Sequence, residues 1–360
     1  MKVKKIIPDP QRIRRGLTRW YDDHRRPLPW RETRDPYAIW ISEIMLQQTR
    51  VETVVPYYRR FIERFPTVES LARAPLGDVL KTWENLGYYA RVRNLHKAAG
   101  EIAARFGGRI PERLEEIIRL PGIGRYTAGA ILSIAFGRAV PAVDGNVRRV
   151  ISRLHAIEES VDDEEVRERI EELVRTLVPT RDPGRFNQAL MELGAVCCTP
   201  KSPACPACPL QNDCRARLQG LAHRLPVRGK KKTIPHREVV AAVIRDGEGR
   251  ILIVQRPSRG LLGSLWKFPG GILNPPEGRE EGLMRIVRDE LGLGIGVGSP
   301  LAAVKHAYTH FRITLTAFSC TLREGSPAGP PWRWAGGDEI EGLPFSKADR
   351  RIACSVTPAG

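Results

Sequence analysis

Leu120–Gly124, with the sequence LPGIG, lies between two segments in which apolar residues recur at helical spacing. Its glycines permit a tight turn whose backbone N–H groups stay free to face an anion, and such a turn can hold a DNA phosphate. A plain helix–helix connection would use the same residues. Helical spacing continues from Gln11 to about Arg217, so this half of the chain is predicted to be nearly all helix.

Four cysteines close the helical half in a C-x6-C-x2-C-x5-C run: Cys198, Cys205, Cys208 and Cys214. Thiolates bind zinc or iron–sulfur clusters, and structural zinc sites usually combine two close pairs, whereas only Cys205 and Cys208 are close here. The spacing therefore favours a [4Fe–4S] cluster. Zinc and reduced structural cysteines are the alternatives, and Cys197 is a spare neighbour.

The chain has 360 residues, a formal net charge of +17 and a pI near 9.9. This length predicts two domains, and the excess of positive charge predicts a nucleic acid partner. Met1–Pro8 is basic but lacks the apolar stretch of a secretory signal, and the longest apolar runs, such as Ala128–Phe136, are too short to span a membrane. We expect a cytoplasmic location and no membrane partner.

The texture of the sequence changes after the cysteines. Residues 221–236 include a basic, proline-bounded stretch and are predicted to be a linker. Beyond it, β-rich runs at 239–244, 251–255 and 313–318 and a helical stretch at 280–291 predict an α+β domain. The predicted organisation is therefore a multidomain protein with an all-α domain at 1–220, a linker at 221–236 and an α+β domain at 237–360.

The α+β domain carries an altered Nudix pattern, G-x5-E-x7-R-E-U-x-E-E-x-G-U, in which clustered glutamates hold Mg²⁺ against a pyrophosphate. Eight residues fall on the pattern: Gly271, Glu277, Arg285, Val287, Asp289, Glu290, Gly292 and Leu293. Ile286 replaces the first glutamate of the central group, and Asp289 replaces another. The carboxylate cage loses one ligand and shortens a second, so the domain is predicted to be Nudix-like (MutT-like) without pyrophosphatase activity.

The order of motifs in the helical half resembles the endonuclease III superfamily of DNA glycosylases: a helix–hairpin–helix, then Val143–Val147 (VDGNV), then the cysteines. Asp144 is also placed to cap a helix at Gly145–Leu154. In the resembled superfamily this aspartate stabilises the positive charge that develops on deoxyribose as the base departs. Both roles can coexist in one side chain.

Three further stretches resemble the MutY-type adenine DNA glycosylases: Leu28–Arg31 (LPWR), Trp40–Thr49 (WISEIMLQQT) and Gly87–Arg91 (GYYAR). Superfamily members that also cut the strand carry a lysine two residues after the second hairpin glycine, where this chain has Tyr126. Without that amine no efficient lyase is expected. The resemblance spans nearly all of residues 11–217.

The implied chemistry uses two carboxyl groups. Adenine is a poor leaving group as an anion, so an acid must protonate it on N7 while an ionised carboxylate faces the oxocarbenium-like sugar. Glu43 fits the acid, because its apolar neighbours should raise its pKa; without the resemblance it would be assigned to a helix surface. Asp144 then acts as the electrostatic partner or as a transient nucleophile, and Tyr126 and Asn146 hold the sugar and the water.

Adenine must leave the base stack to be reached, so the resemblance also implies a pocket and contacts to the opposite base. Trp30, Arg31 and Gln188 are expected around the adenine. Trp30 and Leu86 would otherwise be assigned to the core. The expected contacts to DNA and to the opposite base are Arg26, Leu46, Gln48, Thr49, Leu86, Tyr88, Gly122 and Gly124.

A loop in the second domain, His306–Phe311, resembles the Phe-Ser-His loop with which MutY-type proteins recognise 8-oxoguanine. Tyr308, Thr309 and His310 stand at the three positions. Phe to Tyr and Ser to Thr are departures that put the strength of 8-oxoguanine discrimination in question. An ordinary polar loop between strands is the alternative.

The resemblance implies a monomeric, monofunctional glycosylase that removes adenine mispaired with 8-oxoguanine, or with guanine, from double-stranded DNA. Three alternatives stay open at this point. One is an endonuclease III-like glycosylase and AP lyase, opposed by Tyr126 and the extra domain. The others are a Nudix nucleotide hydrolase fused to a DNA-binding module and a non-enzymatic damage-binding protein.

Overall fold

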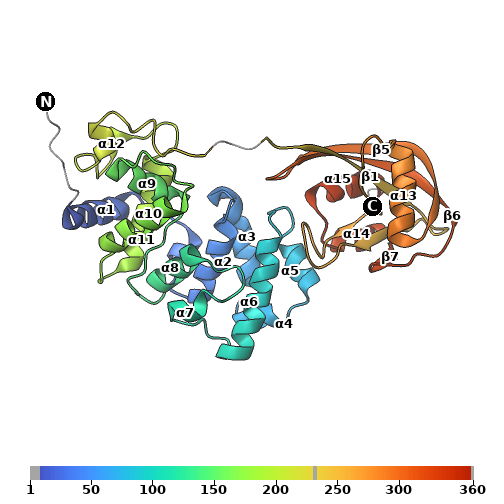
Figure 1. Ribbon diagram of the computed structural model, residues 1–360. Coiled ribbons are helices and arrows are strands. Elements are labelled where there is room, and N and C mark those ends of the chain that lie inside the picture. The colour runs from blue at the N-terminus through green and yellow to red at the C-terminus, as the bar shows by residue number, and fades with distance from the viewer. Residues whose placement is uncertain (1–8, 230–232, 358–360) are drawn as a thin grey trace. The chain divides into compact units, whose positions relative to one another are not determined.

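The computed structural model describes residues 9–229 and 233–357 (Figure 1). These residues form two compact units, one built from residues up to 72 and 97–229, the other from 73–96 and the residues from 233 onward. Helical spacing does not predict that residues 73–96 belong to the same compact unit as the C-terminal half. The domain boundaries given above remain a prediction. The predicted linker partly lies outside the described residues, as does Met1–Pro8.

The described part of the first unit is helical, as predicted. Its longer helices are α1 (Pro10–His24), α2 (Pro36–Leu46), α3 (Val51–Arg64), α8 (Arg125–Ile134), α9 (Gly145–His155), α10 (Glu164–Leu177) and α11 (Pro183–Glu192). Shorter elements connect them: η1 (Pro29–Arg31), α4 (Val68–Arg73), α7 (Leu114–Ile117), η2 (Leu193–Cys197), η3 (Cys205–Ala207) and α12 (Arg215–Leu218). Two more helices contain residues of the 73–96 segment, α5 (Leu76–Thr82) and α6 (Ala90–Phe106).

α2 runs through the interior of the first unit. The Asp35 carboxylate caps it by accepting from the N–H groups of Tyr37 and Ala38 at 3.0 and 3.3 Å. Pro36 occupies the first helical position, where a missing N–H costs nothing. Every residue of α2 from Tyr37 to Met45 is buried, so the carboxyl group of Glu43 is held in the interior.

The predicted hairpin is present between α7 and α8, which pack against each other. Gly122 has a φ of 77°, in the left-handed region that side chains avoid, so the turn requires glycine there. Gly124 begins α8 without a side-chain cap, which leaves backbone N–H groups at that end of the helix available. This is the arrangement that the LPGIG sequence predicts.

α9 starts at the predicted place and joins a core with α1, α10 and α11. Asp144 caps it, with Oδ1 accepting from the backbone N–H of Val147 at 2.7 Å. Apolar residues from the four helices, including Ile13, Ile151 and Phe186, form one buried cluster. Residues 221–229 of the predicted linker pack on this unit, because Leu225 is buried and Val227 O accepts from the backbone N–H of Val161 at 3.0 Å.

The second unit is α+β, as predicted. Its strands are β1 (His236–Ile244), β2 (Ile251–Gln255), β3 (Trp266–Lys267), β4 (Gly270–Ile272), β5 (Gly294–Ala307), β6 (Arg312–Glu324) and β7 (Trp332–Ala335). They form two sheets with the orders β4-β1-β6-β5 and β3-β2-β7, and β1 and β6 run parallel. The helices of this part are α13 (Arg279–Leu291), α14 (Gly337–Gly342) and α15 (Lys347–Val356).

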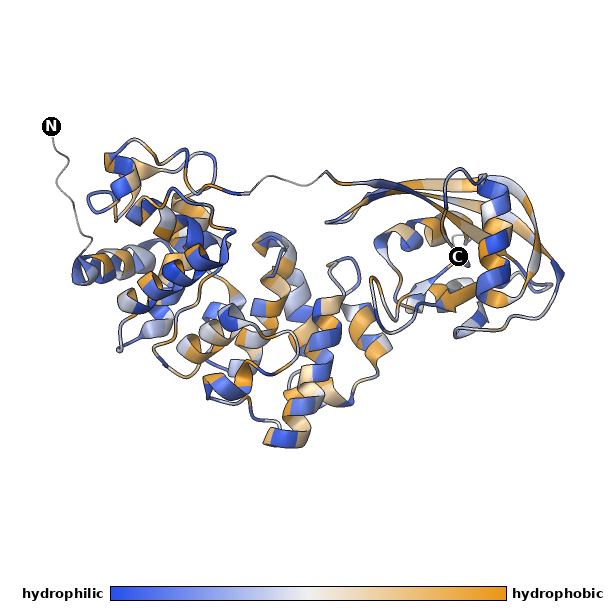
Figure 2. Ribbon diagram, in the orientation of Figure 1, coloured by the Kyte–Doolittle hydropathy of each residue, from blue (hydrophilic) through white to orange (hydrophobic). Residues whose placement is uncertain are grey.

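Alternating residues of the strands pack into two separate hydrophobic cores. Val240, Ala242 and Phe318 pack with Leu283 and Val287 of α13, which carries both hydrophilic and hydrophobic residues (Figure 2). A second cluster contains Ala241 and Val243 from the same strand together with residues of α15. In the described part of the chain, no helix combines the length and the apolar character that crossing a membrane requires.

Candidate active site

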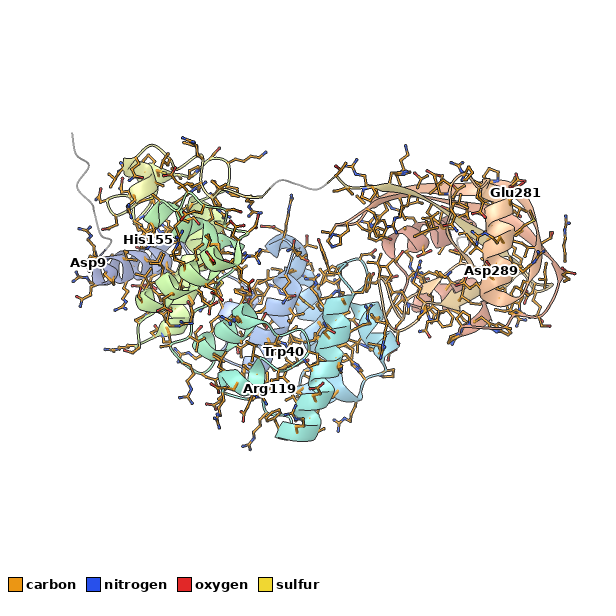
Figure 3. All side chains as sticks on the ribbon, viewed as in Figure 1. Asp9, Trp40, Arg119, His155, Glu281 and Asp289 are labelled. Carbon is orange, nitrogen blue, oxygen red and sulfur yellow. The ribbon has the colours of Figure 1, made fainter. Side chains whose placement is uncertain are left out.

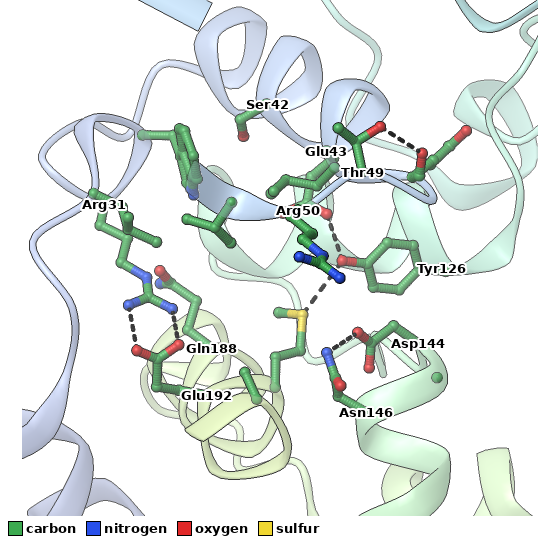
Figure 4. A pocket seen from close by; sticks show the side chains of 18 of the residues that line it. Arg31, Ser42, Glu43, Thr49, Arg50, Tyr126, Asp144, Asn146, Gln188 and Glu192 are labelled. Atoms are coloured by element: carbon green, nitrogen blue, oxygen red, sulfur yellow. Dashed lines mark hydrogen bonds and ion pairs between the residues drawn. The ribbon is translucent and has the colours of Figure 1, made fainter. Parts of the chain in front are cut away.

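A cavity of about 500 Å³ in the first unit collects most of the predicted site residues. Its lining comes from η1, α2, the loop after α2, α8, α9 and α11. The predicted residues around it are Arg26, Trp30, Arg31, Glu43, Leu46, Gln48, Thr49, Tyr126, Asp144, Asn146 and Gln188. Side chains that lie more than a hundred positions apart in the sequence thus face one space (Figure 4).

Glu43 is the buried carboxyl group of this cavity. It is 5% exposed, and its Oε2 accepts a hydrogen bond from the Tyr126 hydroxyl at 2.5 Å. Burial raises the pKa of Glu43 to about 7, because the charged form loses its water; the Tyr126 bond opposes this rise and the Asp144 carboxylate adds to it. A carboxyl group in this state holds a proton near neutral pH and can donate it.

Asp144 combines the helix cap with a position at the cavity. Its Oδ2 accepts a hydrogen bond from the Asn146 amide at 2.9 Å (Figure 4). Its Oδ1 accepts from the backbone N–H of Val147. Burial raises the pKa of Asp144 above its ordinary value, and the hydrogen bonds from Val147 and Asn146 limit that rise. The start of α9 also favours negative charge, so the site contains two carboxyl groups in different surroundings.

The amide of Asn146 is held in turn by Arg149, a residue that no motif in the sequence indicates. Arg149 Nη2 donates to Asn146 Oδ1 at 2.9 Å and to Gly194 O at 2.6 Å, and Arg149 Nε donates to Cys198 O at 2.7 Å. Gly194 must be glycine, since a Cβ there would lie 2.6 Å from the Cβ of Asn146. A continuous set of hydrogen bonds therefore links Asp144 to the backbone of the cysteine segment.

Glu192 is a second site residue that no motif in the sequence indicates. Its side chain is 1% exposed and accepts from Arg26 at 2.8 Å. It also accepts from Arg31 at 2.7 Å (Figure 4). Burial by itself raises the pKa of Glu192, but the bonds from Arg26 and Arg31 lower it to about 2. The carboxylate is therefore charged, and it fixes both guanidinium groups at the cavity.

The remaining predicted adenine-pocket residues lie beside this ion pair. Gln188 Oε1 accepts from the Tyr21 hydroxyl at 3.2 Å, and the Arg31 guanidinium lies 5.4 Å from the centre of the Tyr21 ring. Trp30 is 6% exposed and packs edge-on against Tyr58 with ring centres 5.3 Å apart. Trp30 thus belongs to the core and to the cavity lining at once.

The predicted opposite-base residues fall into two groups. Leu46, Gln48 and Thr49 line the cavity at the end of α2, and Gln48 has a φ of 61°, which is unusual for a residue with a side chain. Leu86 and Tyr88 lie in the second unit, where Leu86 is 5% exposed and Tyr88 is 45% exposed. The structure therefore places Leu86 in a packed interior and Tyr88 at a surface.

The loop between β5 and β6 carries Tyr308, Thr309 and His310. Thr309 and His310 are exposed, whereas the Tyr308 ring packs on Phe311, with centres 4.9 Å apart, and on the core beneath. Thr309 Oγ1 donates to the Tyr88 hydroxyl at 3.1 Å. Two residues predicted for opposite-base contacts, 221 positions apart in the sequence, are thus in direct contact within the second unit.

The four predicted cysteine ligands, together with Cys197, line one small cavity of the first unit. Arg153 is 1% exposed and donates to Cys198 Sγ at 3.2 Å and to Thr199 O at 2.7 Å. A buried guanidinium against a sulfur atom suits a thiolate, so these residues fit a cluster with four thiolate ligands. Among the residues that the structure describes, no three His, Cys, Asp or Glu side chains are arranged as ligands of a single metal ion.

Comparisons with known proteins agree with this fold and site. Residues 41–176 match the family model described as HhH-GPD superfamily base excision DNA repair protein, and residues 240–354 match the NUDIX domain. The solved structure of a thermostable thymine-DNA glycosylase is 30% identical, with a TM-score of 0.54, over 58% of this chain and 97% of that chain. A trapped endonuclease III–DNA covalent intermediate is 27% identical, with a TM-score of 0.51, over 60% and 100%.

The fold and the cavity define a base excision repair glycosylase of the helix–hairpin–helix class with a Nudix-like C-terminal domain, whose substrate is DNA. The adenine DNA glycosylase of Rattus norvegicus is 35% identical over 96% of this chain and 78% of that protein. The Homo sapiens adenine DNA glycosylase is also 35% identical, over 94% and 73%, and that of Buchnera aphidicola subsp. Acyrthosiphon pisum is 34% identical over 81% of each. The chain belongs to the adenine DNA glycosylase family.

Proposed function

We propose that this protein hydrolyses the N-glycosidic bond of adenine paired with 8-oxoguanine or guanine in duplex DNA, and that it does so without cutting the strand. One observation carries the proposal: the cavity holds a buried Glu43 with a pKa of about 7 beside the capping carboxylate of Asp144. Because adenine is a poor leaving group, its departure requires such a pair, a protonated acid and an ionised carboxylate.

Glu43 supplies the proton in this proposal. Its protonated carboxyl group donates to N7 of the flipped adenine, so that the base leaves as a neutral molecule. Tyr126 Oη, at 2.5 Å from Glu43 Oε2, fixes the orientation of that carboxyl group. After the base has left, the ionised Glu43 can take a proton from the attacking water, which restores the starting state.

Asp144 stabilises the sugar in this proposal. Its carboxylate faces the positive charge that develops at C1′, either as an electrostatic partner or as a transient nucleophile. The bonds from Val147 and Asn146 keep the carboxylate fixed, so little reorganisation accompanies the reaction. Tyr126 occupies the position of the lyase amine and has no amine to form a Schiff base, which supports hydrolysis over strand cleavage.

Arg31, Gln188 and Trp30 hold the adenine in this proposal, with Arg26 and Glu192 behind them. Glu192 accepts hydrogen bonds from both arginines. Their guanidinium groups are therefore held in fixed positions at the pocket that the Trp30 ring also lines. A pocket with fixed donors and one aromatic face fits a flipped purine.

Recognition of the opposite base is assigned to the second unit. Thr309 and His310 are exposed at the end of a hairpin, and the Thr309 hydroxyl contacts Tyr88 at 3.1 Å. A hydroxyl and an imidazole beside an exposed aromatic ring can stack on a base and bond to its edge. The Tyr308 ring is used in packing and is not assigned a contact with the base.

A [4Fe–4S] cluster held by Cys198, Cys205, Cys208 and Cys214 completes the proposal. When bound, it would cross-link the segment that follows η2 and so fix the basic residues nearby, including Lys201 and Arg215. Analysis of iron, acid-labile sulfide and zinc in purified protein decides between cluster and zinc. Cys198→Ser should weaken duplex binding before it slows chemistry, with exposed Cys354→Ser as the control; a chemical defect with normal affinity would contradict the structural role.

The substrate assignment is tested with three duplexes that carry adenine opposite 8-oxoguanine, adenine opposite guanine, and thymine glycol. Each is incubated with the purified protein and analysed before and after hot alkali. The proposal predicts strand breaks in the first two duplexes, and only after alkali. Breaks before alkali would indicate a lyase, breaks in the thymine glycol duplex would indicate a pyrimidine glycosylase, and binding without breaks would indicate a damage-binding protein.

A further inference from the structure

The second unit retains three acids of the Nudix pattern, and each one already faces a cation of the protein. Glu277 precedes α13, and Glu290 lies near the C-terminal end of this helix. Asp289 lies near the same end (Figure 3). In Nudix hydrolases the acids of this pattern hold Mg²⁺, a small cation that needs several oxygen ligands in a nearly ideal octahedron. The partners of these three acids therefore decide whether a metal fits here.

Arg285 forms hydrogen bonds with two of the acids. Its Nε and Nη2 donate to the two oxygens of Glu277 at 2.6 and 2.9 Å, and its Nη1 donates to Asp289 Oδ2 at 3.2 Å. The hydrogen bonds from Arg285 hold the pKa of Glu277 down at about 2. One guanidinium group thus engages both carboxylates.

Lys267 of β3 forms an ion pair with the third acid, Glu290. Its ammonium group lies 2.6 Å from Glu290 Oε1 and 2.8 Å from Oε2, and it donates to Gly270 O at 2.6 Å. The Lys267 side chain is 9% exposed. Burial lowers the pKa of Lys267, and the Glu290 carboxylate opposes that shift. A carboxylate and a backbone carbonyl, both oxygen ligands of the kind that divalent cations use, therefore converge on an ammonium group.

The geometry around Gly270 is tightly determined. Its φ is 142°, and a Cβ there would lie 2.2 Å from Val240 O, so β4 can pass β1 only with glycine at this position. The Gly270 N–H also donates to Glu290 Oε2 at 3.3 Å. The carbonyl, the carboxylate and the ammonium are consequently held in one place by β3, β4 and α13.

Ile286 stands at the fourth position of the pattern. Its Cγ2 lies 3.4 Å from where a Cβ of Gly271 would be, so a methyl group packs where the pattern has a carboxylate. It also contacts the apolar core beneath α13. Within residues 233–357 the pattern therefore offers no group of three acidic side chains to an ion, and with Lys267 in place the site does not fit Mg²⁺.

We propose that the ammonium group of Lys267 takes the place of the divalent cation of a Nudix site. It neutralises Glu290 and joins β3, β4 and α13 permanently, so the unit keeps the Nudix fold without metal. The unit is thereby a binding surface that cannot activate a pyrophosphate through Mg²⁺. This inference is independent of which base the first unit removes.

The test uses the full chain and Mn²⁺ as the probe, followed through the electron paramagnetic resonance signal of the free ion and by thermal unfolding. Wild-type protein should bind no more Mn²⁺ than Glu290→Gln, and Mn²⁺ should leave its unfolding temperature unchanged. Binding to wild-type protein that Glu290→Gln abolishes would overturn the proposal. This comparison holds even if no Lys267 variant folds.

Two variants of Lys267 sharpen the test. Lys267→Ala frees space beside Glu290, so Mn²⁺ should bind and raise the unfolding temperature, and Lys267→Ala/Glu290→Gln should lose both effects. Lys267→Met fills the space without charge and should raise the unfolding equilibrium constant at least about 100-fold with no recovery by Mn²⁺. The exposed Lys305→Ala is the matched control. Equal Mn²⁺ responses of Lys267→Ala and the double variant would overturn the proposal.

Discussion

The Tyr126 hydroxyl donates a hydrogen bond to Oε2 of Glu43 at 2.5 Å, and this bond opposes the effect of burial on the same carboxyl group. Burial favours the protonated form, whereas a hydrogen bond from a donor favours the ionised form. The balance leaves the pKa of Glu43 at about 7. Glu43 can therefore give up a proton and take one back near neutral pH.

Loss of either carboxyl group should stop adenine release. Glu43→Gln cannot donate a proton, and Asp144→Asn cannot oppose the charge on the sugar, so each should lower the single-turnover rate at least about 1000-fold. Duplex binding should change little, since neither residue is expected to contact phosphate. The exposed Glu63→Gln on α3 is the control and should react normally. Near-normal release by either active-site variant would refute the assignment.

Burial of Glu43 should also appear in the pH dependence of stability. Its pKa of about 7 lies above the ordinary value of 4.5, so the folded protein binds this proton more tightly than the unfolded chain. The contribution of Glu43 is complete below pH 4.5 and is lost as the pH rises to about 7, an effect of about 3 kcal/mol. Urea unfolding of Glu43→Gln should be correspondingly less dependent on pH over this range; an identical dependence would contradict the shift.

Removal of Glu192 should destabilise the first unit. Glu192→Ala leaves Arg31, whose side chain is 10% exposed, without its carboxylate, and breaking a buried pair costs about 3–5 kcal/mol in the free energy of unfolding. Asp22→Ala breaks the exposed pair of Asp22 with Arg185 and should cost less than about 1 kcal/mol. Denaturant unfolding measures both, and equal losses would show that the Glu192 pair behaves as a surface pair.

The hairpin of the second unit should set the preference for the opposite base. The double variant Thr309→Ala/His310→Ala should reduce the preference for 8-oxoguanine over guanine about tenfold, because it removes hydrogen-bonding groups from an exposed loop. Release of adenine opposite guanine should change less. Ser319→Ala, which removes an exposed hydroxyl on the adjoining strand β6, is the control. An unchanged ratio of the two rates would exclude the loop from recognition.

Local features of the structure followed from the sequence, because short-range physics determines them. The LPGIG turn, the Asp144 cap and the strand at 239–244 each depend on residues a few positions apart. The ion-pair partners of Glu192 and Lys267 could not be predicted from the sequence. Glu192 meets Arg31 from 161 positions away, and Lys267 meets Glu290 from 23 positions away. Nothing in helical or strand spacing specifies such pairs, which depend on how the elements pack.

The resemblance to a family supplied the site residues, but it could not show which of them pack inward. Tyr308 and Leu86 were both expected to contact DNA, and the structure uses the Tyr308 ring and the Leu86 side chain in packing. Tyr88 and Thr309 are exposed, and they are in contact with each other. The structure distinguishes the packed Tyr308 and Leu86 from the exposed Tyr88 and Thr309, and the sequence alone does not show which residues are exposed or in contact.

The central claim is that protonated Glu43 drives the departure of adenine, and the single-turnover rate between about pH 5 and about pH 9 tests it most directly. The rate should be level below pH 7 and fall about tenfold per unit above it, following the pKa of Glu43. Tyr126→Phe removes the bond that lowers this pKa, so the fall should move to higher pH. A rate that stays constant or rises through pH 7, or a fall that Tyr126→Phe moves to lower pH, would contradict the account.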